Sequence, residues 1–118
     1  MNAMAPALYH GVPVLAHRMS KFDPERAFDL MARYRIRTAF FPPTAMKLMR
    51  RVANTARFDL DLRAVVSAGE AMGGELLAWG REAFRLEINE FYGQTECNMV
   101  ASSCAALFAP RPGCIGKP

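Results

Sequence analysis

Short β-prone runs that alternate with helical segments constrain the fold of this chain more than any other feature. Four such runs lie near residues 14, 40, 65 and 89, and a helical segment separates each from the next. This spacing is about the length of a β-α-β unit, in which a helix connects two parallel strands. The pattern therefore predicts an α/β fold, with a parallel β-sheet, alternating helices and right-handed crossovers.

The expected strands are residues 12–16, 38–41, 64–66 and 87–92, and residues 98–101 are a further candidate. Residues 1–10 show no clear periodicity, and residues 110–118 are irregular and are expected to lead out of the domain. The first helix begins at Pro24 with Asp23 as its N-cap, and Thr44 is expected to cap the second. A third helix follows Gly73 and Gly74.

Apolar residues recur at helical spacing along each expected helix, so each has one buried face. The expected inward residues are Ala27, Phe28, Met31 and Tyr34 in the first helix, Met46, Met49 and Val52 or Ala53 in the second, and Leu76, Leu77, Ala83 and Phe84 in the third.

Composition places the chain among globular domains. It has 118 residues, of which 52% are hydrophobic, so it can bury the core of one domain. Its three cysteines, an odd number with no secretory signal before them, favour a reduced, cytoplasmic setting. The longest later uncharged run, residues 97–110, is too short to span a membrane, so no membrane anchor is expected.

The run Tyr92-Gly93-Gln94-Thr95-Glu96 ends the fourth strand and carries groups that suit a nucleotide site. An aromatic ring can stack on a base, and a threonine hydroxyl can bind a phosphate. A carboxylate in the same loop can hold Mg²⁺, which prefers one or two carboxylates together with phosphate oxygens. From spacing alone, a strand-to-loop turn with an exposed acid explains these five residues about equally well.

A second run, Ser67-Ala68-Gly69-Glu70-Ala71, follows the strand at 64–66. Loops that follow parallel strands meet at the carboxyl edge of a sheet, where open α/β sheets bind ligands. The alternative is a glycine turn whose acid lies at the start of the next helix.

Together the two runs resemble the adenylate-forming, AMP-dependent acyl-CoA synthetases, most closely the medium-chain and acetate-like branch. The segment from Gly113 to Pro118 resembles the Gly-x-x-Gly-x-Pro segment that follows in that family. The resemblance covers essentially the whole chain. It implies that residues 1–118 are part of an AMP-binding domain, with 110–118 leading to the next subdomain.

The resemblance also implies roles for single residues. Tyr92 would pack on the adenine, Thr95 would bind the α-phosphate and Glu96 would coordinate Mg²⁺, so Thr95 and Glu96 are the expected catalytic residues. Gln94 would help to frame the phosphate and the acyl carboxylate. Close acetate-activating relatives have a bulky aromatic residue at the position of Gly93, so a glycine there implies a deeper pocket for a medium-chain or aromatic acid.

The earlier loop is the second part of the implied site. Gly69, Glu70 and Ala71 would contribute mainly backbone contacts along the adenine and ribose. The implied activity is ATP-dependent activation of a small carboxylic acid, through an acyl-adenylate, followed by transfer to CoA. ATP or AMP, Mg²⁺ and CoA are the implied cofactors of the intact enzyme.

Several parts of that enzyme do not occur in the sequence. They are the Ser/Thr/Gly-rich phosphate loop, the ribose-binding aspartate, the hinge and the catalytic lysine of the small C-terminal domain. The chain is therefore expected to be an internal fragment of the large N-terminal domain that is inactive alone. The alternative is a non-catalytic α/β fragment that acts only by association, and exposed apolar edges would favour self-association.

A basic nucleic-acid-binding module is a weaker alternative, since a net charge of +4 can come from solvated helix faces. The basic residues concerned are Arg33, Arg35, Arg37, Lys47, Arg50, Arg51 and Arg57. Nucleic acid is therefore not an expected partner. Cys97, Cys104 and Cys114 lack a Cys-x-x-Cys pair, which favours free thiols over a zinc site.

Overall fold

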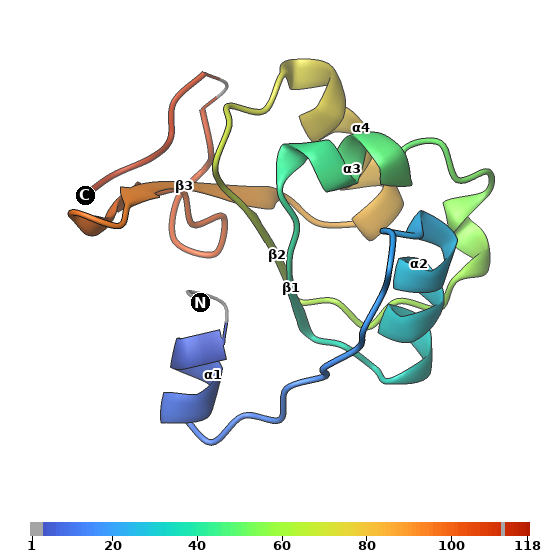
Figure 1. Cartoon of the computed structure of the whole chain (residues 1–118). Helices are drawn as coiled ribbons and strands as arrows, with labels where there is room; N and C mark the ends of the chain where they lie inside the picture. Colours follow the sequence, from blue (N-terminus) through green and yellow to red (C-terminus); the bar gives the residue numbers. More distant parts are fainter. Residues whose placement is uncertain (1–3, 112) are drawn as a thin grey trace.

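A computed structural model describes residues 4–111 and 113–118 of the chain (Figure 1). The helices are α1 (Met4–Tyr9), α2 (Pro24–Arg33), α3 (Pro43–Met49) and α4 (Gly74–Phe84), with a 3₁₀ turn η1 (Thr55–Arg57), and the strands are β1 (Thr38–Phe40), β2 (Ala64–Ser67), β3 (Ile88–Gln94) and β4 (Asn98–Ser102). Residues 1–3 and 112 lie outside the described residues, so the expectations for 1–10 and 110–118 are compared only on the rest.

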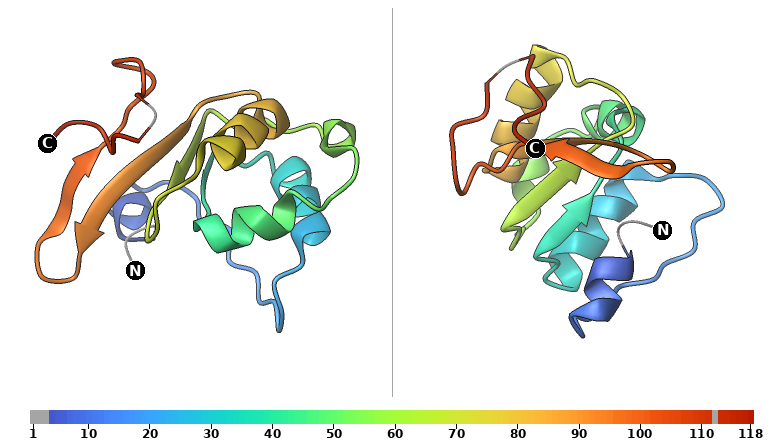
Figure 2. Two further views of the ribbon diagram at one scale, coloured as in Figure 1. Left: turned by 90° about the horizontal axis from the view of Figure 1, so that it is seen from above. Right: turned by 90° about the vertical axis from the view of Figure 1, so that its left-hand side faces the viewer.

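The strands form one sheet in the order β1-β2-β3-β4. β1 pairs with β2 in parallel, and β2 pairs with β3 in parallel. β4 returns along β3 as an antiparallel hairpin, which Figure 2 shows extending away from α2, α3 and α4. The predicted α/β fold is therefore confirmed, and the expected strand at 98–101 is present. The sheet is mostly rather than entirely parallel, because a short turn joins β3 and β4 where a helix would be needed to keep them parallel.

The hydrophobic core lies between the sheet and the helices α2, α3 and α4, which cover the same face (Figure 2). Val65 is fully buried at the centre of this face, paired with Ala39 of β1 and Ile88 of β3. Because side chains alternate along a strand, Phe40 points to the opposite face, where it is 41% exposed. The buried core residues are Ala27, Phe28, Met31, Met46, Met49, Val52, Val65, Met72, Leu76, Phe84 and Ile88.

The start of α2 agrees with the sequence prediction. Asp23 is the N-cap, and its carboxylate accepts a hydrogen bond from the backbone N of Arg26 at 3.1 Å. Pro24 occupies the first turn, where its missing N–H leaves no helical hydrogen bond unmade. Of the expected inward residues of this helix, Tyr34 alone is exposed, because it is the C-cap residue.

The start of α3 differs from the prediction. Thr44 does not cap this helix: Pro42 is the N-cap residue and makes no side-chain cap hydrogen bond, and the helix begins at Pro43. The proline ring already holds φ near the helical value, so the helix can start one residue before the threonine. At the other end of this segment Val52 is buried and Ala53 is exposed, which settles the alternative that the sequence left open.

The predicted strand at residues 12–16 is wrong. This segment belongs to no helix or strand, and Val12, Val14 and Leu15 are exposed. Apolar composition makes a strand only where a neighbouring strand offers hydrogen bonds, and among the described residues none lies beside this segment. Residues 4–9, for which no periodicity was found, form the short helix α1.

Candidate functional site

The two runs that resemble the family, at residues 67–71 and 92–96, both lie at the carboxyl ends of the parallel strands. β2 ends at Ser67, which is paired with Glu90 of β3, and the 68–73 loop begins there. β3 continues past this pair for four more residues, to Gln94. The last residues of β3 therefore extend beyond the end of β2, on the side of the sheet where the 68–73 loop leaves it.

The 68–73 loop is exposed at its tip and anchored at its end. Gly69 has φ of +100°, a conformation that favours glycine, and Gly69, Glu70 and Ala71 are all exposed. Lys47 of α3 lies 3.9 Å from the Glu70 carboxylate, a long ion pair between exposed groups. Met72 is 8% exposed and packs in the hydrophobic core. The loop thus presents its backbone and the side chains of Glu70 and Ala71 outward, while the buried side chain of Met72 anchors its end.

The second segment is a strand end followed by a tight turn. Tyr92 and Gln94 belong to β3, opposite Ala101 and Asn98 of β4, so the strand is longer than the expected 87–92. Thr95 and Glu96 lie in the turn and are exposed. Tyr92 is 44% exposed.

Gly93 lies where β3 and β4 approach closely. The pairing register shifts between Tyr92 and Gly93, and a Cβ placed on Gly93 would overlap the backbone O of Asn98. A side chain at this position would collide with the backbone of β4. Gly93 therefore has a structural reason to be glycine in this hairpin, independent of any acyl pocket.

Glu90 connects β3 to the 68–73 loop and belongs to neither of the two runs that resemble the family. Its Oε1 accepts a hydrogen bond from the backbone N of Met72 at 3.1 Å. Among the described residues, no hydrogen bond joins residues 69–71 directly to residues 92–96. The bond between Glu90 and Met72 therefore connects the strand that carries one segment to the loop that carries the other. A polar pair, Asn89-Glu90, between Ile88 and Phe91 was the signal that could have identified it.

Ser67 adds a buried polar atom at the same edge. Its side chain is fully buried, and its Oγ has no hydrogen-bond partner among the described residues. By strand alternation it points to the same face as Val65, towards the helices.

The residues at this edge fit Mg²⁺ only together with phosphate oxygens. Among the described residues there is no group of three or more His, Cys, Asp or Glu side chains that could hold a metal ion. Glu96 offers one exposed carboxylate, and it takes part in none of the ion pairs between described residues. One carboxylate is a donor set that Mg²⁺ accepts when a nucleotide supplies the remaining ligands.

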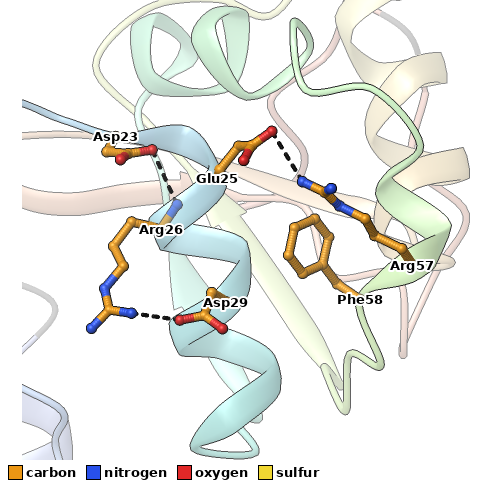
Figure 3. A pocket seen from close by; sticks show the side chains of 6 residues that line it. All are labelled: Asp23, Glu25, Arg26, Asp29, Arg57 and Phe58. Atoms are coloured by element: carbon orange, nitrogen blue, oxygen red, sulfur yellow. Dashed lines mark hydrogen bonds and ion pairs between the residues drawn. The ribbon is translucent and has the colours of Figure 1, made fainter.

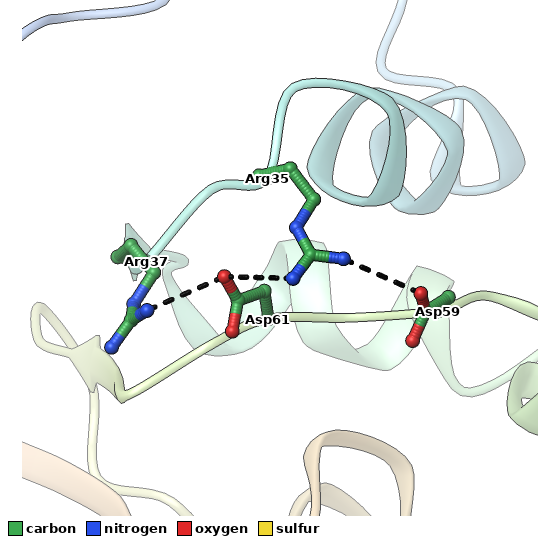
Figure 4. A network of polar contacts seen from close by, with 4 residues as sticks. All are labelled: Arg35, Arg37, Asp59 and Asp61. Atoms are coloured by element: carbon green, nitrogen blue, oxygen red, sulfur yellow. Dashed lines mark hydrogen bonds and ion pairs between the residues drawn. The ribbon is translucent and has the colours of Figure 1, made fainter.

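Many basic side chains of the helices and loops are paired with carboxylates. Arg35 lies within 3.4 Å of Asp59 and 3.3 Å of Asp61, and Arg37 lies 3.3 Å from Asp61 (Figure 4). These pairs tie the chain after α2 to the segment before β2. Further ion pairs join Lys47 to Glu70, Arg50 to Glu75 and Arg57 to Glu25.

A hollow of about 360 Å³ lies beside the start of α2, away from both segments. Asp23, Glu25, Arg26, Asp29, Arg57 and Phe58 line it (Figure 3). Its charged side chains already have partners within the chain: Arg57 pairs with Glu25, Arg26 pairs with Asp29, and Asp23 caps α2. The volume of this hollow is therefore not by itself evidence that it binds a ligand.

In the described part of the chain, no helix is long and apolar enough to cross a membrane.

Comparisons with known proteins agree with the resemblance. Residues 1–118 match the family of AMP-binding enzymes. The chain is 32% identical over 112 residues to the uncharacterized acyl-CoA ligase YtcI of Bacillus subtilis, covering 94% of this chain and 19% of that protein. The chain thus spans about a fifth of the length of the curated relatives that it matches.

Solved structures give the same result for the fold. The acyl-CoA synthetase of Brucella canis matches with a TM-score of 0.83 and 32% identity, over 93% of this chain and 21% of that one. The anthranilate CoA ligase AuaEII, solved in complex with anthranoyl-AMP, matches with a TM-score of 0.72 and 27% identity, over 80% of this chain and 18% of that one. The chain belongs to the AMP-binding enzymes and, within them, to the adenylate-forming acyl-CoA synthetase family.

Proposed function

We propose that this chain forms the adenine- and phosphate-binding part of an acyl-CoA synthetase that activates a carboxylic acid with ATP. The observation that supports this most strongly is the position of the two family segments, at the ends of the neighbouring parallel strands β2 and β3. This is the edge at which open α/β sheets bind ligands. On this proposal residues 1–118 are one part of the AMP-binding domain, and 110–118 lead towards its next subdomain.

In the proposed reaction, a carboxylate oxygen of the acid attacks the α-phosphorus of ATP. The bond to the β,γ-phosphates breaks, which gives an acyl-adenylate and pyrophosphate. The thiol of CoA then takes the acyl group and releases AMP. The work of the protein in such a step is mainly to position the reactants and to place donors where negative charge develops.

Different residues of this chain would contact the adenine, the ribose and the α-phosphate. The exposed ring of Tyr92 would stack on the adenine, and the exposed tip Gly69-Glu70-Ala71 would lie along the adenine and ribose with its backbone. Thr95 would donate its hydroxyl to the α-phosphate.

The other two residues of the second segment would contact the charged groups. Gln94 would frame the phosphate and the acyl carboxylate, and Glu96 would hold Mg²⁺ through its carboxylate. When bound, Mg²⁺ neutralises part of the phosphate charge.

The acid is proposed to be medium-chain or aromatic. The anthranoyl-AMP that is bound in the related ligase AuaEII supports an aromatic acid. Gly93 supports it less strongly than the sequence suggested, because the close approach of Asn98 already requires a glycine at this position. A cytoplasmic location, where ATP and CoA are available, is part of the proposal.

Calorimetric titration of the chain with AMP tests this function. We expect binding by the unaltered chain and an affinity about fivefold or more lower in Tyr92→Ala, because stacking of a base on an aromatic ring contributes about 1–3 kcal/mol. Tyr34→Ala is the matched control, since Tyr34 is a similarly exposed tyrosine at the end of α2. Absence of AMP binding in a folded sample, or equal losses in the two variants, would contradict the proposal.

The same titration with ATP, with and without Mg²⁺, tests Glu96. We expect Mg²⁺ to raise the affinity of the unaltered chain for ATP, and Glu96→Gln to remove most of that increase. A full increase in Glu96→Gln would exclude this carboxylate as a metal ligand. Pyrophosphate release with ATP, Mg²⁺ and a panel of acids separates a self-sufficient enzyme from an inactive fragment.

A further inference from the structure

Glu90 joins β3 to the loop that follows the neighbouring strand. It lies on the same face of β3 as Ile88, towards the helices, and its side chain reaches across the end of β2. There its Oε1 accepts the hydrogen bond from the backbone N of Met72, and this bond is partly buried. A hydrogen bond to a carboxylate is about twice as strong as one between neutral groups.

This bond fixes the end of the exposed loop. Met72 directly follows Ala71, and its side chain is packed in the core. Its backbone N–H would otherwise be a partly buried donor without a partner, which is costly. The core holds the side chain of Met72, and Glu90 holds its backbone, so the direction in which residues 69–71 leave the sheet is set by both.

Glu90 is itself held in place from the other side of β3. The Glu90 backbone N donates to Oγ of Ser103 at 2.7 Å, and the Ser103 backbone N donates to the Glu90 backbone O at 2.8 Å. Ser103 is 6% exposed. Two hydrogen bonds in opposite directions fix the backbone from which the Glu90 side chain extends. Tyr92 lies two residues further along the same strand.

We propose that Glu90 is a positioning residue of the nucleotide site, which sets the 68–73 loop relative to Tyr92 through its hydrogen bond to Met72 N. This inference rests on the proposed function and adds to it a residue outside the two family segments. It assigns Glu90 no contact with the nucleotide. This role requires an acceptor oxygen at the end of a side chain as long as that of glutamate. The negative charge of the Glu90 carboxylate is secondary.

The test compares three variants of the chain. Glu90→Ala removes the acceptor, and Glu90→Gln keeps an acceptor oxygen on a side chain of the same length. Asn89→Ala is the matched control: Oδ1 of Asn89 accepts a hydrogen bond of 2.8 Å from Ala105 N, on the other face of the same strand. It therefore removes a similar bond from the adjacent residue without touching the 68–73 loop.

Hydrogen exchange of the Met72 amide without nucleotide measures the contact directly. We expect exchange about tenfold or more faster in Glu90→Ala, and near the unaltered rate in Glu90→Gln and Asn89→Ala. Equal Met72 exchange rates in Glu90→Ala and the unaltered chain would overturn the inference. This measurement needs no nucleotide, so it stands apart from the test of the proposed function.

Calorimetry with AMP then measures the consequence. We expect an affinity about tenfold lower in Glu90→Ala, within about threefold of the unaltered value in Glu90→Gln, and unchanged in Asn89→Ala. Equal losses of AMP affinity in Glu90→Ala and Asn89→Ala would show that Glu90 acts only through the general stability of the fold. That result would overturn the inference. A loss in Glu90→Gln as large as in Glu90→Ala would assign the effect to the charge, which also overturns it. If the unaltered chain binds no AMP, the proposed function fails and the role of Glu90 towards a nucleotide fails with it.

Discussion

Gly93 shows how one residue can satisfy two separate demands. On the proposed function, Gly93 would leave the acyl pocket deep, and in this hairpin it allows β3 and β4 to approach each other. The second demand follows from the structure, because a Cβ at position 93 would overlap the backbone O of Asn98. Backbone cannot move aside as the end of a flexible side chain can. A larger residue at this position therefore requires β4 to move.

We expect Gly93→Ala to lower the free energy of unfolding by about 1–3 kcal/mol, the usual cost of overpacking. Urea unfolding followed by circular dichroism measures it. Gly74→Ala is the control, because a Cβ at Gly74, the first residue of α4, meets no atom within 4 Å. It should leave stability unchanged or raise it by up to about 1 kcal/mol. Equal stability of Gly93→Ala and the unaltered chain would show that the hairpin adjusts freely.

Among the elements, the start of α2 is the one that the sequence specifies most completely. Asp23, Pro24 and the acidic Glu25 are all local signals, and the buried residues Phe28 and Met31 follow at helical spacing. These local signals fix the residue at which the helix begins, whereas its stability comes mainly from packing of its buried face. Removal of the N-cap side chain should therefore be enough to destabilise the first turn of α2.

Asp23→Ala should lower the free energy of unfolding by about 1 kcal/mol, because the backbone N–H of Arg26 loses its acceptor. Asp29→Ala, which removes the exposed ion pair with Arg26 on the same helix, should cost less than about 0.5 kcal/mol. Thermal or urea unfolding of both variants measures the difference. Equal losses would mean that the carboxylates act through the charge of the helix surface and not through the cap.

The strands were predictable to the extent that their signals were local. The runs at β1, β2 and β3 each end at a turn or a proline and were found, whereas residues 12–16 have the same apolar character and form no strand. The difference lies in pairing, which depends on residues far away in the sequence. The same holds for the site: family segments identified Tyr92 and Gly69, but the bond between Glu90 and Met72 joins residues 18 apart and had no local signal beyond a polar pair within a strand.

At the scale of the whole molecule, the helices that pack on the sheet lie on one face of it. α2, α3 and α4 all contribute to the core beside Val65, and β1 and β4 are the edge strands. On the opposite face, the ring centroids of Phe40 and Phe91 lie 6.1 Å apart, and Phe40 is 41% exposed. An apolar sheet face beside a three-residue edge strand is a surface through which two copies can associate.

We therefore expect the chain to self-associate through this face, so that its sedimentation coefficient rises with protein concentration. Phe40→Thr should weaken the association, because it removes the exposed ring and keeps a residue that favours strands. Leu48→Gln is the control, since Leu48 is an exposed apolar residue of α3, on the other side of the molecule from this face, and its loss should leave association unchanged. A monomer at every concentration, or equal association of Phe40→Thr and the unaltered chain, would show that this face is not the contact. Weaker association in Phe40→Thr alone would place the contact on the face that α2, α3 and α4 leave open.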